Sequence, residues 1–161
     1  MSRRSPQIAD PSWRRGFFEV GVYHPKTEMN MGTLMRSAFQ LGAAGVFTIG
    51  RRYKAEASDT YKTFRHLPIR HFATFEEFQE ARPKAARLVG VEMGGKPLGQ
   101  TSHPQQAIYL LGAEDHGLPP DVLAKCQQVI SLEAVRTPSY NVAVTGSLVM
   151  YHRCFLGDVA P

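Results

Sequence analysis

The chain has 161 residues, of which 43% are hydrophobic and 20% charged, so we expect a folded globular protein with a substantial core. No apolar run approaches the roughly 20 residues of a membrane-spanning helix, and no signal peptide is recognisable, so a cytoplasmic protein with no membrane partner is predicted. Two cysteines exclude a disulfide framework and a cysteine metal cluster.

The charge of the chain is unevenly distributed. Residues 1–75 carry 12 Lys/Arg against 5 Asp/Glu, whereas residues 76–161 carry 7 against 9, within a net charge of +5. A basic half attracts polyanions, and phosphate backbones are their usual form. A basic surface that only aids solubility is the alternative.

Strand and helix signals alternate along the first half. Residues 1–16 form a basic, Pro-containing arm that we expect to be flexible, and the apolar run 17–23 predicts a strand. Asn30 is a suitable N-cap for a helix over 31–41, which Gly42 closes. The sequence then predicts a strand at 45–50, a basic and aromatic segment at 51–66, a strand at 69–72 and a helix at 75–81.

The second half continues the alternation. We expect strands at 87–91, 107–111 and 129–132, a short helix from Pro119, and an apolar helix at 142–156 that ends before Gly157. This order predicts an α/β fold, a mostly parallel sheet with helices on both faces, in a single domain over 17–161.

Several common site motifs are missing. The sequence has no P-loop, no Gly-x-Gly-x-x-Gly after the first strand and no Gly-x-Ser-x-Gly elbow, which argues against the enzyme classes that need them. The six histidines lack metal-ligand spacing, so no metal is expected.

Three segments carry candidate site residues instead. In the first, Arg36 can grip a phosphate through its planar fork of donors, although a solvated Arg on an amphipathic helix is the plain alternative. In the second, Gly112 and Gly117 let the backbone approach a ligand, and Glu114 can accept from amides or hold a neighbouring loop. A simple turn into the next helix is equally compatible with that segment.

The third segment precedes the apolar helix. Ser139 or Asn141 can cap this helix, whose N-terminus favours an anionic or polarised group, and a cap without further function is the alternative. Ligands of open α/β sheets bind outside the carboxyl ends of the strands. We therefore interpret residues 107–155 as a cofactor pocket.

Together these segments resemble the three motifs of the SPOUT superfamily of RNA methyltransferases, in its TrmH/SpoU branch. The motif order, the distance from Asn30 to Arg36, the pattern Leu-Gly-x-Glu-x-x-Gly-Leu at 111–118 and the pair Ser139-x-Asn141 all match, over about residues 17–156. The resemblance implies a SPOUT fold with a C-terminal deep trefoil knot and a homodimer whose site combines both subunits. It also implies S-adenosylmethionine as cofactor, held at the matching positions Val91, Gly112, Glu114, Gly117, Leu132 and Tyr140.

The resemblance further implies methylation of a ribose 2′-hydroxyl in tRNA or rRNA, with Arg36, Asn30, Ser139 and Asn141 as catalytic residues. Because Arg stays protonated in proteins, we expect Arg36 to bind the adjacent RNA phosphate and stabilise charge on the ribose oxygen rather than accept its proton. The other three residues would position Arg36 and the ribose.

The sequence departs from the family pattern at two positions and leaves three other functions open. Tyr140 stands where Leu or Met is common, and Glu133 stands where many members have Pro. In the absence of a separate RNA-binding domain, the basic arm and the segment 51–66 would have to hold the RNA. A non-catalytic RNA-binding relative, a base methyltransferase and an unrelated α/β nucleotide-binding protein remain alternatives.

Overall fold

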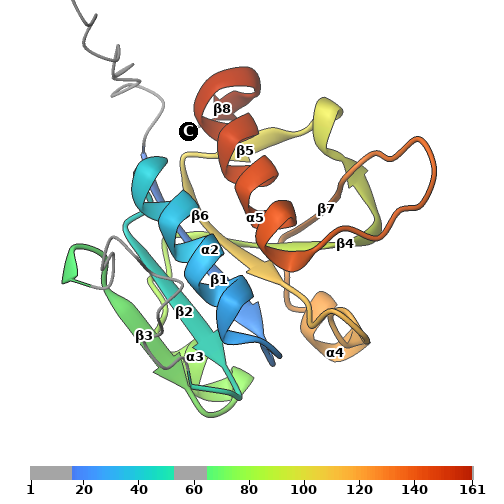
Figure 1. The fold of residues 1–161 in the computed structure, drawn as a ribbon. Coiled ribbons are helices and arrows are strands. Elements are labelled where there is room, and N and C mark those ends of the chain that lie inside the picture. Colours follow the sequence, from blue (N-terminus) through green and yellow to red (C-terminus); the bar gives the residue numbers. More distant parts are fainter. Residues whose placement is uncertain (1–15, 53–64, 161) are drawn as a thin grey trace, which may run out of the picture.

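The computed structural model describes residues 16–52 and 65–160. Within them, six parallel strands form one sheet in the order β3-β2-β1-β6-β4-β7 (Figure 1). These strands are β1 (Phe17–Tyr23), β2 (Gly45–Ile49), β3 (Ile69–Phe72), β4 (Arg87–Pro97), β6 (Gln106–Leu111) and β7 (Gln128–Ser131). Two short strands, β5 (Ser102–Pro104) and β8 (Asp158–Ala160), pair in a second parallel sheet.

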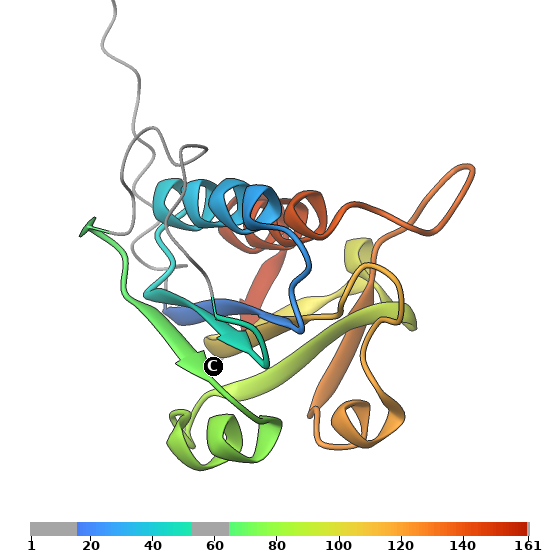
Figure 2. The same ribbon diagram turned by 60° about the horizontal axis from the view of Figure 1, so that its bottom comes forward.

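Helices cover both faces of the large sheet (Figure 2). On one face lie α2 (Glu28–Gln40) and α5 (Val142–Tyr151), and on the other lie α3 (Phe75–Ala81) and α4 (Pro120–Leu123). Strands covered on both faces are mainly apolar, and β1 and β6 are accordingly buried and apolar at most positions. The predicted α/β architecture with a largely parallel sheet is confirmed.

Each face of the sheet has its own hydrophobic core. Leu34 and Met35 of α2 pack with Val149 and Met150 of α5 in one core. On the opposite face, the rings of Phe47 and Phe78 stack with centroids 4.7 Å apart. Val122 of α4 and Leu110 of β6 belong to this second core.

Gly146 allows α5 to lie close to α2. A Cβ atom at this position would come within 2.4 Å of Cδ1 of Leu34 and 3.0 Å of Cδ1 of Leu111. Ser147 adds a polar contact between the helices, because its hydroxyl donates to the hydroxyl of Ser37 at 2.7 Å. The helices α2 and α5 are therefore direct neighbours.

Two predicted boundaries are wrong. Asn30 is not the N-cap of α2; Thr27 has that role, since its hydroxyl accepts from the amide of Asn30 at 3.3 Å. The predicted helix 142–156 divides into α5 and a π-helical turn, η3 (His152–Leu156), where the amide of Gly157 donates to the carbonyl of His152.

Other elements differ only in length or were not predicted. Strand β4 continues six residues beyond the predicted end at Val91, through a break in its pairing with β7. The 3-10 turn η2 (Leu98–Gln100) and the strands β5 and β8 were not foreseen, because segments of three residues carry no periodic pattern. Gly42 closes α2 with a φ of 80°, as predicted.

A buried chain of hydrogen bonds joins the C-terminal helix to the sheet. Arg153 donates to the phenol oxygen of Tyr109 at 3.1 Å, and this oxygen lies 2.7 Å from Nδ1 of His103. Nε2 of His103 lies 2.8 Å from Nδ1 of His152. Since Arg can only donate, the phenol oxygen accepts from Arg153, and its own hydrogen is available to Nδ1 of His103. Burial, followed by the charges of His152 and Arg153, lowers the pKa of His103 to about 3.

Some predictions lie outside the described residues or stay predictions. The basic arm falls on residues 1–15 and most of the basic, aromatic segment on 53–64, neither of which the structure describes. The trefoil knot and the single-domain organisation stay predictions. In the part of the chain that the structure describes, no helix is long and apolar enough to span a bilayer, and no three His, Cys, Asp or Glu side chains group as metal ligands.

Candidate functional site

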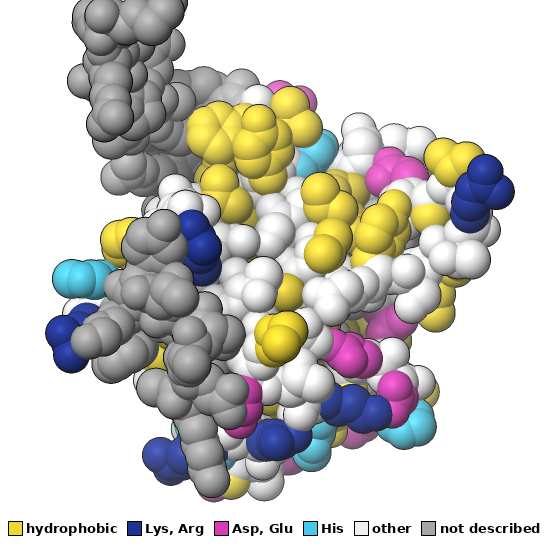
Figure 3. Space-filling model, viewed as in Figure 1, with side chains coloured by type: hydrophobic (Ala, Val, Ile, Leu, Met, Phe, Trp, Pro, Cys, Tyr) yellow, Lys and Arg dark blue, Asp and Glu magenta, His cyan; other side chains and the backbone are white. Residues whose placement is uncertain are grey.

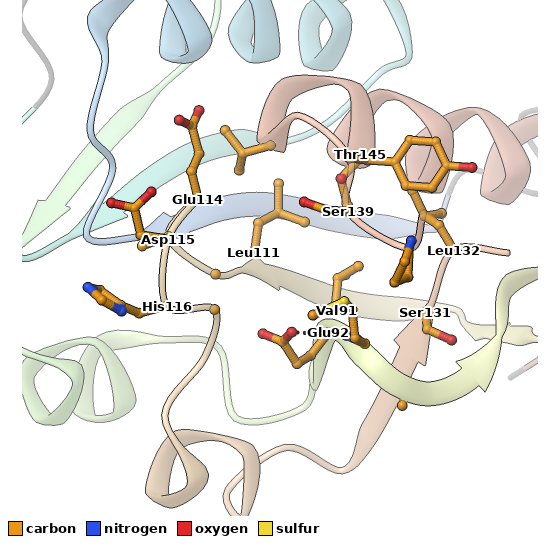
Figure 4. A pocket seen from close by; sticks show the side chains of 18 residues that line it. Val91, Glu92, Leu111, Glu114, Asp115, His116, Ser131, Leu132, Ser139 and Thr145 are labelled. Carbon is orange, nitrogen blue, oxygen red and sulfur yellow. Dashed lines mark hydrogen bonds between the residues drawn. The ribbon is translucent and has the colours of Figure 1, made fainter. Parts of the chain in front are cut away.

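A pocket of about 360 Å³ opens at the carboxyl ends of β6 and β7 and beside the middle of β4, where the pairing of β4 with β7 is interrupted. In Figure 4, Glu114 and Asp115 lie on one side of it and Ser139 and Leu132 on the other, with Val91 between them. The lining residues are Val91, Glu92, Met93, Gly94, Leu111, Gly112, Ala113, Glu114, Asp115, His116, Gly117, Ser131, Leu132, Pro138, Ser139, Tyr140, Val142 and Thr145. The pocket thus lies where ligands of parallel sheets usually bind.

Asn30 connects the three predicted motifs. Its side-chain amide donates to the carboxylate of Glu114, and its oxygen accepts from the side-chain amide of Asn141 at 3.0 Å. The oxygen of Asn141 in turn accepts from the amides of Ala143 and Val144, at 2.9 and 3.2 Å, and so caps α5. One hydrogen-bonded series therefore runs from the loop after β6 through α2 to the start of α5.

The loop after β6 owes its shape to its glycines. Gly117 has a φ of 62°, and a Cβ there would lie 2.2 Å from Oε2 of Glu92. A Cβ at Gly112 would lie 2.6 Å from Cα of Gly117. Glu92 holds the end of the loop, because Oε2 accepts from the amide of Leu118 at 2.7 Å. These glycines therefore line the pocket and also let the loop close against itself and against β4.

The structure brings most of the predicted site residues together. All six predicted cofactor positions line the pocket, and Ser139 lines it as well. Asn30 and Asn141 adjoin it through the carboxylate of Glu114. Arg36 lies on the exposed side of α2, more than a turn beyond Asn30, and is not a lining residue.

Sequence reasoning missed several residues of the pocket. Glu92 is the most informative, since it lines the pocket and also fixes the neighbouring loop. Its position directly after the predicted strand 87–91 was the available signal, because polar residues that follow a parallel strand are candidates for the ligand edge. Asp115, His116 and Thr145 are further lining residues that gave no separate signal.

Known proteins of similar sequence or structure share this architecture. A relative from Archaeoglobus fulgidus, described as an uncharacterised tRNA/rRNA methyltransferase, is 28% identical over an alignment of 149 residues, which covers 84% of this chain and 63% of that protein. The chain therefore spans less than two thirds of the length of this relative.

Two solved structures give the same picture of the fold. The SpoU methyltransferase AviRb from Streptomyces viridochromogenes, in complex with AdoMet, aligns with a TM-score of 0.76 and 24% identity over 87% of this chain and 57% of AviRb. A structure reported for the 2-OH methylation of C/U34 on tRNA aligns with a TM-score of 0.75 and 24% identity, over 86% of this chain and 89% of that one. The family model extends over both the motifs and the sheet: because the SpoU rRNA methylase model matches residues 18–151, the chain belongs to the SpoU rRNA methylase family.

Proposed function

We propose that this chain is an S-adenosylmethionine-dependent RNA methyltransferase that methylates a ribose 2′-hydroxyl of tRNA or rRNA. The observation that carries the proposal is the pair of hydrogen bonds by which Asn30 joins Glu114 and Asn141 beside the pocket. Residues from three distant segments meet there, which a set of independent helix caps and turns would not require. Membership of the family and the AdoMet-bound relative support the choice of cofactor.

The pocket fits an adenosyl group in size and chemistry. Small-molecule sites in proteins commonly enclose about 300–1,000 Å³ and combine apolar walls with a few polar groups. Here Val91, Leu132 and Val142 are apolar lining residues, while Glu92 and Ser139 are polar ones. At Gly94, which has a φ of 88°, an added Cβ would meet no atom within 4 Å, so this part of the rim is open space.

The residues of the chain would act by binding and positioning. When bound, S-adenosylmethionine supplies a methyl group that its positive sulfur already activates. Val91, Leu132 and Tyr140 would hold the adenosyl part, and Asn30 and Asn141 would keep the loop after β6 against the start of α5. Such fixed geometry is what an in-line attack by a ribose oxygen requires.

Arg36 would bind the RNA. We assign it to the phosphate beside the target nucleotide, where its charge also stabilises the developing negative charge on the ribose oxygen. Lys26, Arg51 and Arg52 are exposed after β1 and β2, close to the same edge of the sheet, and add positive charge there. Asp115, which pairs with Lys26, ties this region to the loop after β6.

The proposal includes a homodimer. Val144, Leu148, Tyr151 and Phe155 follow helical spacing along α5 and η3, and Leu148, Tyr151 and Phe155 are 42%, 50% and 39% exposed. Hydrophobic side chains gather on this face in the space-filling view (Figure 3). A second copy of the chain would cover this face and bring its own Arg36 near the pocket of the first.

The activity can be tested with total RNA and cofactor carrying a tritiated methyl group. Purified protein should transfer the label, and alkaline hydrolysis should leave it in alkali-stable dinucleotides, because a 2′-O-methyl group blocks cleavage of the next phosphodiester. Label in mononucleotides would instead indicate base methylation, and no transfer to any RNA would refute the enzymatic proposal. Arg36→Lys should lose most activity, whereas substantial retained activity would contradict a role for the planar fork.

The dimer is tested by light scattering after size-exclusion chromatography. Leu148→Glu places a charge on the exposed apolar face and should yield a monomer. Ala124→Glu is the matched control, since Ala124 is exposed at the end of α4 on the opposite side of the sheet. A monomeric parent protein, or a dimer unaffected by Leu148→Glu, would refute this interface.

A further inference from the structure

The loop between β7 and α5 projects from the rim of the pocket (Figure 1). Every residue from 133 to 140 is exposed, and the side chain of Val135 is fully so. The loop nevertheless ends at Tyr140, which lines the pocket. Whatever fixes the base of this loop therefore also fixes one wall of the pocket.

Two hydrogen bonds fix that base. The phenol of Tyr140 donates to the backbone carbonyl of Glu133 at 2.7 Å, which joins the two ends of the loop. The carboxylate of Glu133 accepts from the amide of Gly99 at 2.8 Å, which ties the loop to the turn after β4. A Cβ at position 99 would lie 2.8 Å from the same carboxylate oxygen, so Gly99 leaves room for this contact.

We propose that Glu133 and Tyr140 form a clasp that holds the loop 133–140 and the Tyr140 ring in the position needed for cofactor binding. Without the hydrogen bond of the phenol, the half-exposed ring of Tyr140 can change rotamer. The two ends of the loop are then no longer joined directly by this bond. If the Tyr140 ring and the loop became ordered only when the ligand binds, the entropy lost would weaken the affinity. A ring and loop that are already ordered in the free protein avoid this loss. Glu133 does not line the pocket, so it acts as a positioning residue through Tyr140.

This inference rests on the proposed function for the identity of the ligand, but not for the state of the loop. Loop order can be measured without ligand, because Arg136 is exposed at the tip and is followed by Thr137, which permits cleavage by trypsin. Cleavage there divides the chain into residues 1–136 and 137–161, which mass spectrometry identifies among other products.

Tyr140→Phe is the primary test, since it removes only the hydroxyl. We expect cleavage after Arg136 to become several-fold faster in the ligand-free protein. Calorimetry with S-adenosylhomocysteine should show affinity weaker by about fivefold, the effect of one lost neutral hydrogen bond. Tyr23→Phe, which changes a partly buried tyrosine outside both the pocket and the proposed dimer face, is the control and should alter neither quantity.

Variants of Glu133 separate the clasp from general loop packing. Glu133→Gln keeps an oxygen for the amide of Gly99 and should behave like the parent protein. Glu133→Ala should speed cleavage and weaken binding, and its effect should be less than additive with Tyr140→Phe, because both changes open one clasp.

The outcomes are distinguishable. Cleavage of Tyr140→Phe at the parental rate would overturn the clasp whatever the ligand does, and so would accelerated cleavage with unchanged affinity. Failure of the parent protein to bind S-adenosylhomocysteine would refute the proposed function, and with it the ligand-binding role of the clasp. In that case, faster cleavage of Tyr140→Phe than of the parent protein would still establish that the hydrogen bond of the phenol orders the loop.

Discussion

His103 should make the stability of the protein fall as the pH drops below neutral. Its imidazole is buried against Tyr109 and His152, with the charge of Arg153 nearby, and its pKa is lowered to about 3 from an ordinary value of 6.5. Between these two values the unfolded chain binds a proton that the folded protein does not. The contribution of neutral His103 to the free energy of unfolding is therefore complete above pH 6.5 and is lost as the pH falls from there towards 3.

The magnitude follows from this difference in pKa. Below the unfolded pKa of 6.5, each pH unit costs about 1.4 kcal/mol in the free energy of unfolding. From pH 7 to pH 5 the contribution of His103 is about 2 kcal/mol. Burial also lowers the pKa of His152, partly offset by Glu133, so His152 changes stability in the same direction.

His103→Gln tests the reasoning, because a glutamine can accept from Tyr109 and donate to His152 without titrating. Urea denaturation followed by circular dichroism at pH 7, 6 and 5 gives the free energy of unfolding of each form. The variant should lose about 2 kcal/mol less than the parent protein between pH 7 and pH 5. His66→Gln, at an exposed position, should keep the parental pH dependence. Equal losses in His103→Gln and the parent would refute the argument.

Three further changes test a close packing contact, a helix cap and a partly buried ion pair. Gly21→Ala places a Cβ 2.2 Å from the buried ring of Phe47 and should lower the free energy of unfolding by about 2 kcal/mol in urea titrations, where an unchanged midpoint would contradict the packing. Asn141→Ala removes the side chain that caps α5 and should lower the free energy of unfolding by about 1 kcal/mol, whereas Asn141→Ser should retain most of that stability. Equal losses in the alanine and serine variants would argue against capping. Arg70→Met removes the guanidinium that lies 2.6 Å from the buried carboxylate of Glu19, and it should lower the free energy of unfolding by about 2 kcal/mol. Adding Glu19→Gln to that variant should recover part of this loss, as measured by thermal and urea denaturation.

Local sequence signals were sufficient for most of the fold. The strands at 17–23 and 69–72 and the helix at 75–81 have the predicted bounds, because each is set by residues within or beside it. Gly42 likewise ends α2 through its own backbone conformation. Such features depend on neighbours in sequence, which a reading of the chain can see.

The site could be located from its motifs but its connections could not be derived. Asn30 was assigned as a cap because it precedes an apolar helical pattern, whereas its side chain bonds to Glu114 and Asn141, which are 84 and 111 residues later. The contact of Glu133 with Gly99 spans 34 residues and has no sequence pattern either. A short polar side chain has several possible partners, and only the folded chain selects among them.

The distance of Asn30 from its partners also bears on how the protein is made. During synthesis α2 leaves the ribosome long before the loop after β6, and α5 follows that loop. A nascent chain cannot complete the wall of the pocket that Val142 and Thr145 form until α5 has emerged and docked against α2. A chain that stops before Val142 would lack this wall of the pocket, even with all six strands of the main sheet complete.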